Sequence, residues 1–149
     1  MRISKKCQYA LRAVFELALR NTGKPVKIHD IAAAQGIPPR FLEVILNQLR
    51  HEGYVESRRG NEGGYMLVRG AEKLTVGEVI GTIEGPVSIA GDESDNYNKG
   101  GSFFGGYAFE QLWEKVNSAV KQVWDNTTIA ELVKYEMSMK NESVPNYVI

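Results

Sequence analysis

Apolar residues in the first part of the chain recur at the spacing of amphipathic helices. One such stripe runs over residues 5–20 and ends at the polar, glycine-containing run 21–23. A shorter helix is predicted over residues 28–35, where Gly36 supplies the sharp turn that follows it. The stripe of the first helix consists of Tyr9, Ala10, Ala13, Val14, Leu17 and Ala18.

The third predicted helix opens with two prolines and runs to about His51. Proline suits the first helical position because the N–H that it lacks would have no partner there. The predicted buried side consists of residues at helical spacing, Leu42, Ile45, Leu46 and Leu49. The opposite side carries Arg40, Glu43, Val44, Asn47 and His51.

A hairpin is predicted after the third helix. Residues 54–58 and 65–69 favour β-strands, and the connection between them is rich in glycine. The order helix, helix, turn, helix, hairpin is that of a winged helix-turn-helix, in which the third helix enters the major groove of DNA. We therefore assign residues 1–70 to a DNA-binding domain.

The rest of the chain predicts a connecting segment and two further helices. Thr75 and Glu78 form a capping box that opens a helix, and Gly85 followed by Pro86 stops it. A long, mostly polar loop follows, then a long helix over about 108–125, and a second capping box opens a last helix. We divide this part into a connecting helix with an effector-type loop, 71–107, and a dimerisation helix with a final helix and tail, 108–149.

The long helix carries more apolar surface than one small core requires. Exposed apolar stripes usually mark interfaces, although a purely intramolecular core helix is the alternative. The predicted dimerisation residues are Phe109, Leu112, Trp113, Val116, Val120, Val123 and Trp124. The expected fold class is mainly α with one small β-hairpin, a winged helix-turn-helix followed by a long C-terminal dimerisation helix.

A net charge of zero conceals a strong asymmetry along the chain. Residues 1–70 hold 12 Lys and Arg against six Asp and Glu, whereas residues 71–149 hold six against 12. Phosphate binding depends on the potential within about one Debye length, roughly 10 Å, so the basic first part can bind DNA although the total is neutral. A chance difference between the halves is the alternative explanation.

The composition argues against several classes of protein. No apolar run reaches the roughly twenty residues of a membrane span and the N-terminus lacks an apolar signal core, so we expect a cytoplasmic protein without a membrane partner. The single cysteine, Cys7, leaves no disulfide framework and no thiolate cluster for a metal, and it favours a core position over a redox role. Without a nucleophile elbow, an HExxH motif or a spaced Cys/His set, we predict that the protein is not an enzyme.

The hydrophilic side of the third helix offers groups that can read base pairs. Arginine pairs with guanine, asparagine with adenine, glutamate accepts from cytosine, and valine can contact a thymine methyl group. In the hairpin, arginines beside a flexible turn can enter a narrow minor groove. The alternatives are a solvated helix face and a phosphate loop, but a phosphate loop needs a following helix and a Lys-Ser/Thr pair. The predicted DNA-binding residues are Pro39, Arg40, Glu43, Val44, Asn47, His51, Arg58, Arg59 and Gly60.

Several short motifs together resemble the Rrf-type winged helix-turn-helix regulators, the group that includes IscR, NsrR and CymR. The resemblance covers most of the chain, and each motif alone is weak. The motifs are MRISK at 1–5, YALR at 9–12, DIA at 30–32, FLE at 41–43, LR at 49–50, GYV at 53–55, RG at 59–60, GGYML at 63–67, LTVGEVI at 74–80, EGP at 84–86 and LW at 112–113.

The resemblance implies a transcription regulator, expected to be a repressor, that binds a pseudo-palindromic operator as a homodimer. It implies that the long helix crosses its partner, that Arg40 and Glu43 approach bases, and that Arg59 and Gly60 lie near the minor groove. It also suggests a link to cysteine and sulfur or iron–sulfur metabolism.

Two segments of the chain bear on cofactor and partner. Cluster-binding relatives place three cysteines in the loop that corresponds to residues 90–107, which has none here, so no iron–sulfur cofactor is expected. Either this protein senses another signal or its cysteines have been substituted. The tail is similar to isoleucine-ended peptides that dock into cysteine synthase, which suggests that enzyme as a partner of Tyr147, Val148 and Ile149, whereas a mobile tail is the alternative.

Two other classes of function remain open at this point. One is a protein-interaction module that acts with a partner such as cysteine synthase. The other is a small-molecule sensor that uses the 90–107 loop, suggested by Phe103, Phe104 and Tyr107.

Overall fold

The structure, a computed structural model, describes residues 2–89 and 104–143. Within these ranges the chain is mainly helical with one antiparallel hairpin, which confirms the predicted fold class. The elements are α1 (Lys5–Leu19), α2 (Ile28–Gln35), α3 (Pro39–His51), β1 (Val55–Arg58), β2 (Gly64–Leu67), α4 (Val76–Glu84), α5 (Gly106–Asn126) and α6 (Ile129–Ser143).

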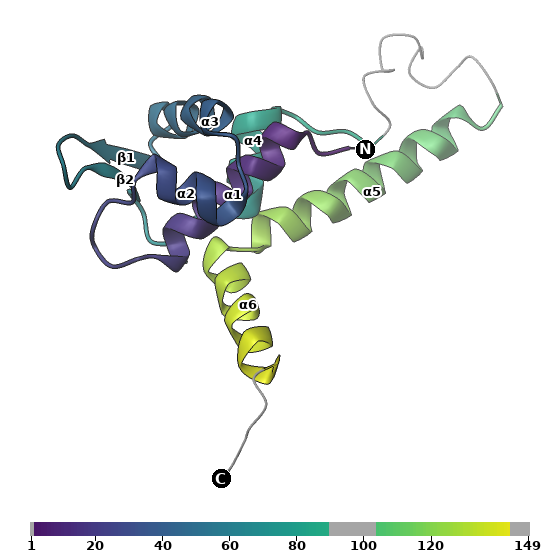
Figure 1. Ribbon diagram of the computed structural model, residues 1–149. Helices are drawn as coiled ribbons and strands as arrows, with labels where there is room; N and C mark the ends of the chain where they lie inside the picture. The colour runs from purple at the N-terminus through teal and green to yellow at the C-terminus, as the bar shows by residue number, and fades with distance from the viewer. Residues whose placement is uncertain (1, 90–103, 144–149) are drawn as a thin grey trace.

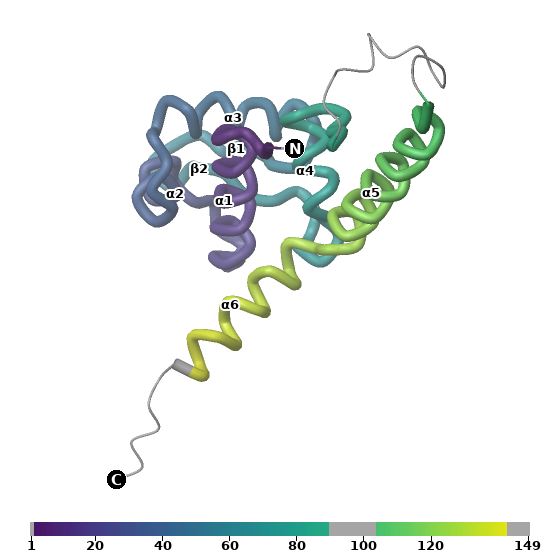
Figure 2. Tube along the Cα trace, turned by 90° about the vertical axis from the view of Figure 1, so that its right-hand side faces the viewer, coloured from purple at the N-terminus to yellow at the C-terminus, as the bar shows by residue number. Residues whose placement is uncertain are grey.

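Helices α1 to α4 and the hairpin pack into one module, from which α5 and α6 extend (Figure 1). Helix α5 leaves the module as a long arm, and α6 starts where α5 ends and points away from it. The turned view shows the same separation, with α5 and α6 diverging from one side of the module (Figure 2). The module holds the core, whereas no residue of α5 is fully buried.

The core of the module is built around α1 and α3. The four residues predicted to form the buried side of α3, Leu42, Ile45, Leu46 and Leu49, are all 0% exposed, which confirms that prediction. They share one apolar cluster with the alanines and valine of the α1 stripe and with Val79 and Ile80 of α4. Helix α6 is attached through Ile129, which is buried and donates its N–H to the Leu74 carbonyl at 2.8 Å. In the described residues, no helix combines the length and apolarity of a membrane span.

Several element boundaries differ slightly from those predicted, including those of both strands, which span Val55–Arg58 and Gly64–Leu67. Helix α1 ends at Leu19 because Arg20 has left helical geometry and caps the helix, donating its N–H to the Glu16 carbonyl at 3.0 Å. Strand β2 ends at Leu67, and the Arg69 side chain turns to α4. Helix α5 begins two residues earlier than predicted, after Gly105, which has a left-handed backbone conformation with a φ of 104°.

A third segment joins the hairpin to the rest of the module. Val26 and Tyr65 exchange two backbone hydrogen bonds, each 2.8 Å long, so the chain before α2 pairs with β2 at a single bridge. The close approach depends on Gly64, because a Cβ at that position would lie 2.3 Å from the Val26 carbonyl oxygen. The hairpin is therefore fixed to the module at Tyr65, while residues 59–62 at its tip are exposed.

Glu16 is a charged side chain in the core that the sequence pattern did not reveal. It is 3% exposed, and both carboxylate oxygens have partners. One accepts from Arg20 Nε at 2.5 Å and the other from Gln35 Nε2 at 2.7 Å. Because Gln35 ends α2, this carboxylate joins the first two helices of the helix-turn-helix, and its hydrogen bonds offset its desolvation.

Replacing Glu16 with alanine is expected to lower the free energy of unfolding by about 2–3 kcal/mol, because the substitution leaves the Gln35 amide and Arg20 without their acceptor. Urea unfolding followed by circular dichroism measures the change. The matched control is Glu136→Ala on the exposed surface of α6, which should change stability by less than about 0.5 kcal/mol. Equal effects of the two substitutions would contradict the role given to Glu16.

Candidate DNA-binding surface

Helix α3 presents its hydrophilic side to solvent. All five residues predicted for this side are exposed: Arg40, Glu43, Val44, Asn47 and His51. The apolar Val44 among them is 57% exposed. The helix starts with Pro39 at its first position, as expected, and its last turn is basic. Side chains that read bases must be free of packing within the protein, and this side of α3 meets that requirement.

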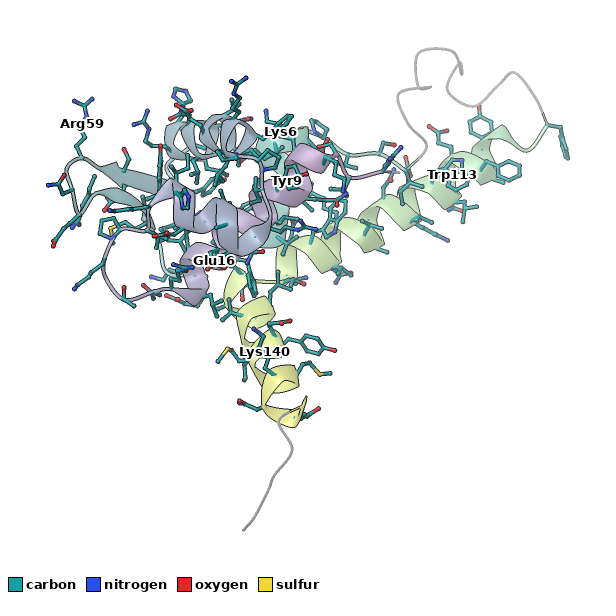
Figure 3. The ribbon with its side chains drawn as sticks, in the orientation of Figure 1. Lys6, Tyr9, Glu16, Arg59, Trp113 and Lys140 are labelled. Carbon is teal, nitrogen blue, oxygen red and sulfur yellow. The ribbon has the colours of Figure 1, made fainter. Side chains whose placement is uncertain are left out.

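The wing, formed by β1, β2 and their connection, carries Arg59 at its tip, at the end of the molecule opposite α5 (Figure 3). Gly60, with a φ of 108°, and Gly63 close the turn through a 3.0 Å hydrogen bond. Arg58 lies 3.6 Å from the Glu56 carboxylate, which neutralises part of its charge. In the described ranges no acidic group lies within ion-pair distance of Arg59, so this guanidinium is available for a ligand.

Three contacts extend the surface beyond the residues predicted from the sequence. Arg50 Nη1 donates to Ser57 Oγ at 3.1 Å, which connects the last turn of α3 to β1 and sets the wing relative to that helix. At the other end of α3, Phe41 is 57% exposed and its ring lies 6.4 Å from that of Tyr9 on α1. Arg12 lies over the same Tyr9 ring at 5.9 Å. The exposed aromatic Phe41 was the one sequence signal for this extension, since pairing with α1 could not be read from spacing.

Helix α4 is hydrogen-bonded to three parts of the module near this surface. The bonds come from α3, from the start of α1 and from the base of the wing. They are Gln48 Nε2 to the Thr82 carbonyl at 2.8 Å, the Ser4 N–H to Glu84 Oε1 at 2.8 Å, and Arg69 Nη2 to Glu78 Oε1 at 2.9 Å. A displacement of α4 would therefore shift or break its hydrogen bonds to α3, to the start of α1 and to the wing at the same time.

The Glu78 carboxylate should make stability depend on pH in acid. Partial burial raises the pKa of Glu78, but hydrogen bonds from the Thr75 N–H and Arg69 outweigh it, and the pKa lies below its ordinary value of 4.5. A lowered pKa in the folded state stabilises the protein above the unfolded pKa, and this contribution is lost as pH falls through the folded pKa. We expect Glu78→Gln to flatten the decline of unfolding free energy below about pH 4.5, by less than about 1 kcal/mol because the side chain is partly exposed. Urea titrations at several pH values test this, with Glu136→Gln as the control that should keep the parent slope.

The cysteine content does not fit a cluster bound by cysteines. Cys7, the single cysteine, is fully buried on α1, and burial together with Glu84 raises its pKa to about 12. Such a thiol stays protonated at neutral pH, which agrees with the core position predicted for it. Residues 90–103 lie outside the described residues, and in the described ranges no group of three His, Cys, Asp or Glu is placed to hold a metal ion.

The apolar stripe predicted on the long helix lies largely in solvent in the single chain. Phe109, Leu112, Trp113 and Val123 are 52%, 45%, 40% and 64% exposed, and the other three stripe residues, Val116, Val120 and Trp124, are half-buried. Trp113 lies on the part of α5 that extends beyond the module (Figure 3). The module alone does not cover this helix.

Comparison with known proteins identifies the family. The sequence profile of the Rrf2 family, described as iron-dependent transcriptional regulators, matches residues 3–135. The chain belongs to the Rrf2 family. This Rrf2 protein is 33% identical over 138 residues to the HTH-type transcriptional regulator CymR of Bacillus subtilis, covering 91% of each chain. It is 35% identical over 134 residues to IscR of Escherichia coli, covering 89% of this chain and 80% of the relative.

Solved structures agree with the fold of the Rrf2 protein. CymR, the global cysteine regulator of B. subtilis, matches with a TM-score of 0.77 and 32% identity over 91% of this chain and 98% of its own. IscR of T. potens matches with a TM-score of 0.76 and 29% identity over 99% of this chain and 95% of its own. These similarities confirm the predicted family, the winged helix-turn-helix, and a role as a DNA-binding transcription regulator and not as an enzyme.

Proposed function

We propose that this Rrf2 protein represses transcription by binding a pseudo-palindromic operator as a homodimer. The observation that carries the proposal is the exposed hydrophilic side of α3, whose apolar side is fully buried in the module. Two modules related by a two-fold axis can place their α3 helices in successive major grooves, about 34 Å apart, which favours a palindromic site.

Within each half-site, α3 reads bases. Arg40 and Asn47 suit guanine and adenine, and Glu43 suits the amino group of cytosine. Val44 can contact a thymine methyl group, while Pro39 and His51 lie at the two ends of the contact. Because a base contact discriminates between sequences, Glu43 should affect base preference more than overall affinity.

The wing contacts the flanking minor groove. The position of Arg59 at the tip and the open space around Gly60 support this role, and Arg58 would contact the DNA backbone. An arginine in a narrow minor groove gains from the enhanced negative potential there. From these roles we propose three parts of the chain: a DNA-binding part, 1–70, a connecting part, 71–107, and a dimerising part, 108–149. Helix α4 belongs to the connecting part by sequence, but it packs in the core of the DNA-binding part.

Selection of bound fragments from random DNA, followed by affinity measurements at several salt concentrations, tests the proposal. We expect enrichment of an inverted repeat and a slope of log affinity against log salt of about −0.9 for each phosphate neutralised. A protein-interaction module would enrich no sequence and would show little salt dependence. That result would leave the Rrf2 fold in place and exclude the proposed operator.

We further infer that the regulated genes belong to cysteine and sulfur metabolism. The similarity to CymR, a global cysteine regulator, supports this assignment, and so does the absence of the cysteines that an iron–sulfur cluster would require.

The proposed partner is cysteine synthase, which would bind Tyr147, Val148 and Ile149. These residues lie outside the described residues, as does most of the proposed sensor loop. A chain shortened by Val148 and Ile149 should lose binding to purified cysteine synthase in calorimetry, and unchanged binding would exclude the tail as the docking peptide.

A further inference from the structure

A groove of about 530 Å³ lies between α4 and α5, and its α5 side carries a line of polar side chains. Asn117, Lys121 and Asp125 lie one helical turn apart and all line the groove. The volume falls within the range of small-molecule sites, roughly 300–1,000 Å³. Because the Lys121 and Asp125 side chains are 74% and 45% exposed, a ligand can reach them from solvent.

The opposite wall of the groove is apolar. It is formed by Ile80 and Gly81 of α4 and by the segment that follows this helix, including Val87, while Trp124 of α5 lies beside the polar line. Among the described residues of α4 and of the segment 85–89, none that lines the groove is charged. A ligand that fits both walls therefore has polar groups on one side and an apolar group on the other.

Gly81 leaves space in this groove. A Cβ at Gly81 would meet no heavy atom within 4 Å, whereas one at Gly77, a turn earlier, would lie 2.0 Å from Asp125 Oδ1. Gly77 is therefore needed for the contact between α4 and α5, but packing within the chain gives no reason for glycine at 81. Since a glycine inside a helix is less favourable than alanine, the open space at Gly81 agrees with a molecule bound there.

The charges along α5 define the chemical class of this molecule. Lys121 Nζ forms an ion pair with Asp125 Oδ2, so the cation is already neutralised. A simple anion that bound Lys121 would compete with Asp125 and place a second negative charge beside that carboxylate. A molecule with both a carboxylate and an ammonium group avoids this repulsion, because it replaces one ion pair by two.

Asn117 offers a further donor to a carboxylate. Its Oδ1 accepts the Ile89 N–H at 2.8 Å, which joins the segment after α4 to α5. Within residues 2–89 and 104–143 its amide Nδ2 makes no hydrogen bond, so this group can donate to a ligand. A carboxylate between Asn117 and Lys121 would have a neutral donor on one side and a cation on the other.

We propose that the α4–α5 groove binds a free α-amino acid with a small, uncharged side chain as the signal that regulates DNA binding. The carboxylate of the ligand pairs with Lys121 and Asn117, and its ammonium group pairs with Asp125. Its side chain occupies the apolar space over Gly81, beside Trp124. The inference rests on the proposed function and adds to it the chemical class of the signal.

A ligand in this groove would act on the DNA-binding surface through α4. Hydrogen bonds join α4 to α3 through Gln48 and to the base of the wing through Arg69. The ligand would also contact Val120 and Trp124, which belong to the predicted dimerisation stripe. A shift of α4 on binding would therefore change operator affinity, and the operator would change the affinity for the amino acid by the same factor.

Calorimetry on the full chain without DNA tests the site. The probes are L-alanine, L-serine, L-cysteine, L-valine, L-leucine and L-methionine, each compared with the carboxylate that lacks its amino group. We expect at least one of these amino acids to bind with a Kd below about 1 mM, and its carboxylate analogue to bind about tenfold more weakly or worse. If none of the six binds, or if the analogue binds equally well, the groove is not a site for α-amino acids.

Variants of the polar line locate the bound amino acid. Lys121→Gln and Asp125→Asn should each weaken its binding about tenfold or more, because each leaves one charge of the ligand without its partner. Lys115→Gln is the matched control, since Lys115 is an exposed lysine on the same helix that does not line the groove. Equal binding by all three variants would place the ligand elsewhere.

Gly81→Leu tests the apolar space without removing a charge. The variant should lose binding of the amino acid because the new side chain fills the groove, and parent-like circular dichroism would verify that it folds. Its dimerisation, measured by sedimentation equilibrium, should equal that of the parent. A loss of dimerisation would instead mean that a side chain of the partner subunit fills the groove, and unchanged binding of the amino acid would exclude the groove as its site.

Operator binding distinguishes a failure of this inference from a failure of the proposed function. The bound amino acid should change the operator affinity of the parent about threefold or more and leave that of Lys121→Gln unchanged. If the parent binds its operator equally with and without the amino acid, the groove does not regulate DNA binding, and the repressor assignment stands. A chain that binds no operator would exclude the proposed function, whereas calorimetry without DNA would still decide the site.

Discussion

The Arg59→Ala variant should bind the selected operator about 30 to 1,000 times more weakly than the parent. Loss of one arginine contact costs about 1–2 kcal/mol, and in a symmetric dimer the loss occurs at both half-sites. The two sites are far apart, so their effects add to about 2–4 kcal/mol. Fluorescence anisotropy with a labelled operator at fixed salt measures the change.

The control for Arg59 is Lys134→Ala, an equal loss of positive charge on α6, away from the module. It should change affinity by less than threefold. A second comparison separates charge from shape, since Arg59→Lys should recover part of the affinity if phosphate attraction dominates and little if the guanidinium must fit a narrow groove. If Arg59→Ala and Lys134→Ala bind alike, the wing does not contact DNA in the proposed way.

The sequence predicted α3 well because local pattern and tertiary packing agree there. The two prolines fixed the start of the helix, and the spacing of Leu42 and Leu49 matches the side that the module buries. The exposed side then followed from helical geometry alone. The stripe of α5 was predicted for the same reason, since residues from Phe109 to Trp124 keep helical spacing whether or not a partner is present.

Features that depend on residues far apart in the sequence were not predicted. Glu16 has the sequence context of a solvated helix face, yet Gln35, 19 residues away, makes it a core residue. The bridge between Val26 and Tyr65 likewise joins two segments whose patterns carry no signal for each other. Both contacts are polar, and hydrophobic periodicity reports only the apolar side of each element.

The Gly64→Ala variant is expected to lose about 2–4 kcal/mol of stability and to bind the operator poorly. The new Cβ would lie 2.3 Å from the Val26 carbonyl oxygen, a backbone atom that cannot move without breaking the pairing with Tyr65. The φ of Gly64, 152°, is also unfavourable for alanine. Urea unfolding gives the stability, and operator affinity measured where the variant is still folded reports the displaced wing.

Gly81→Ala is the matched control, because it makes the same chemical change where nothing lies within 4 Å and the backbone is helical. It should raise stability by up to about 1 kcal/mol, since alanine favours the helix and restricts the unfolded chain. Opposite signs for two identical substitutions would show that the bridge at Val26, and not the loss of glycine as such, holds the wing in place. If Gly64→Ala were as stable as the parent and bound the operator as well, the bridge at Val26 would not be what positions the wing, and the Arg50–Ser57 and Arg69–Glu78 contacts would remain for that role.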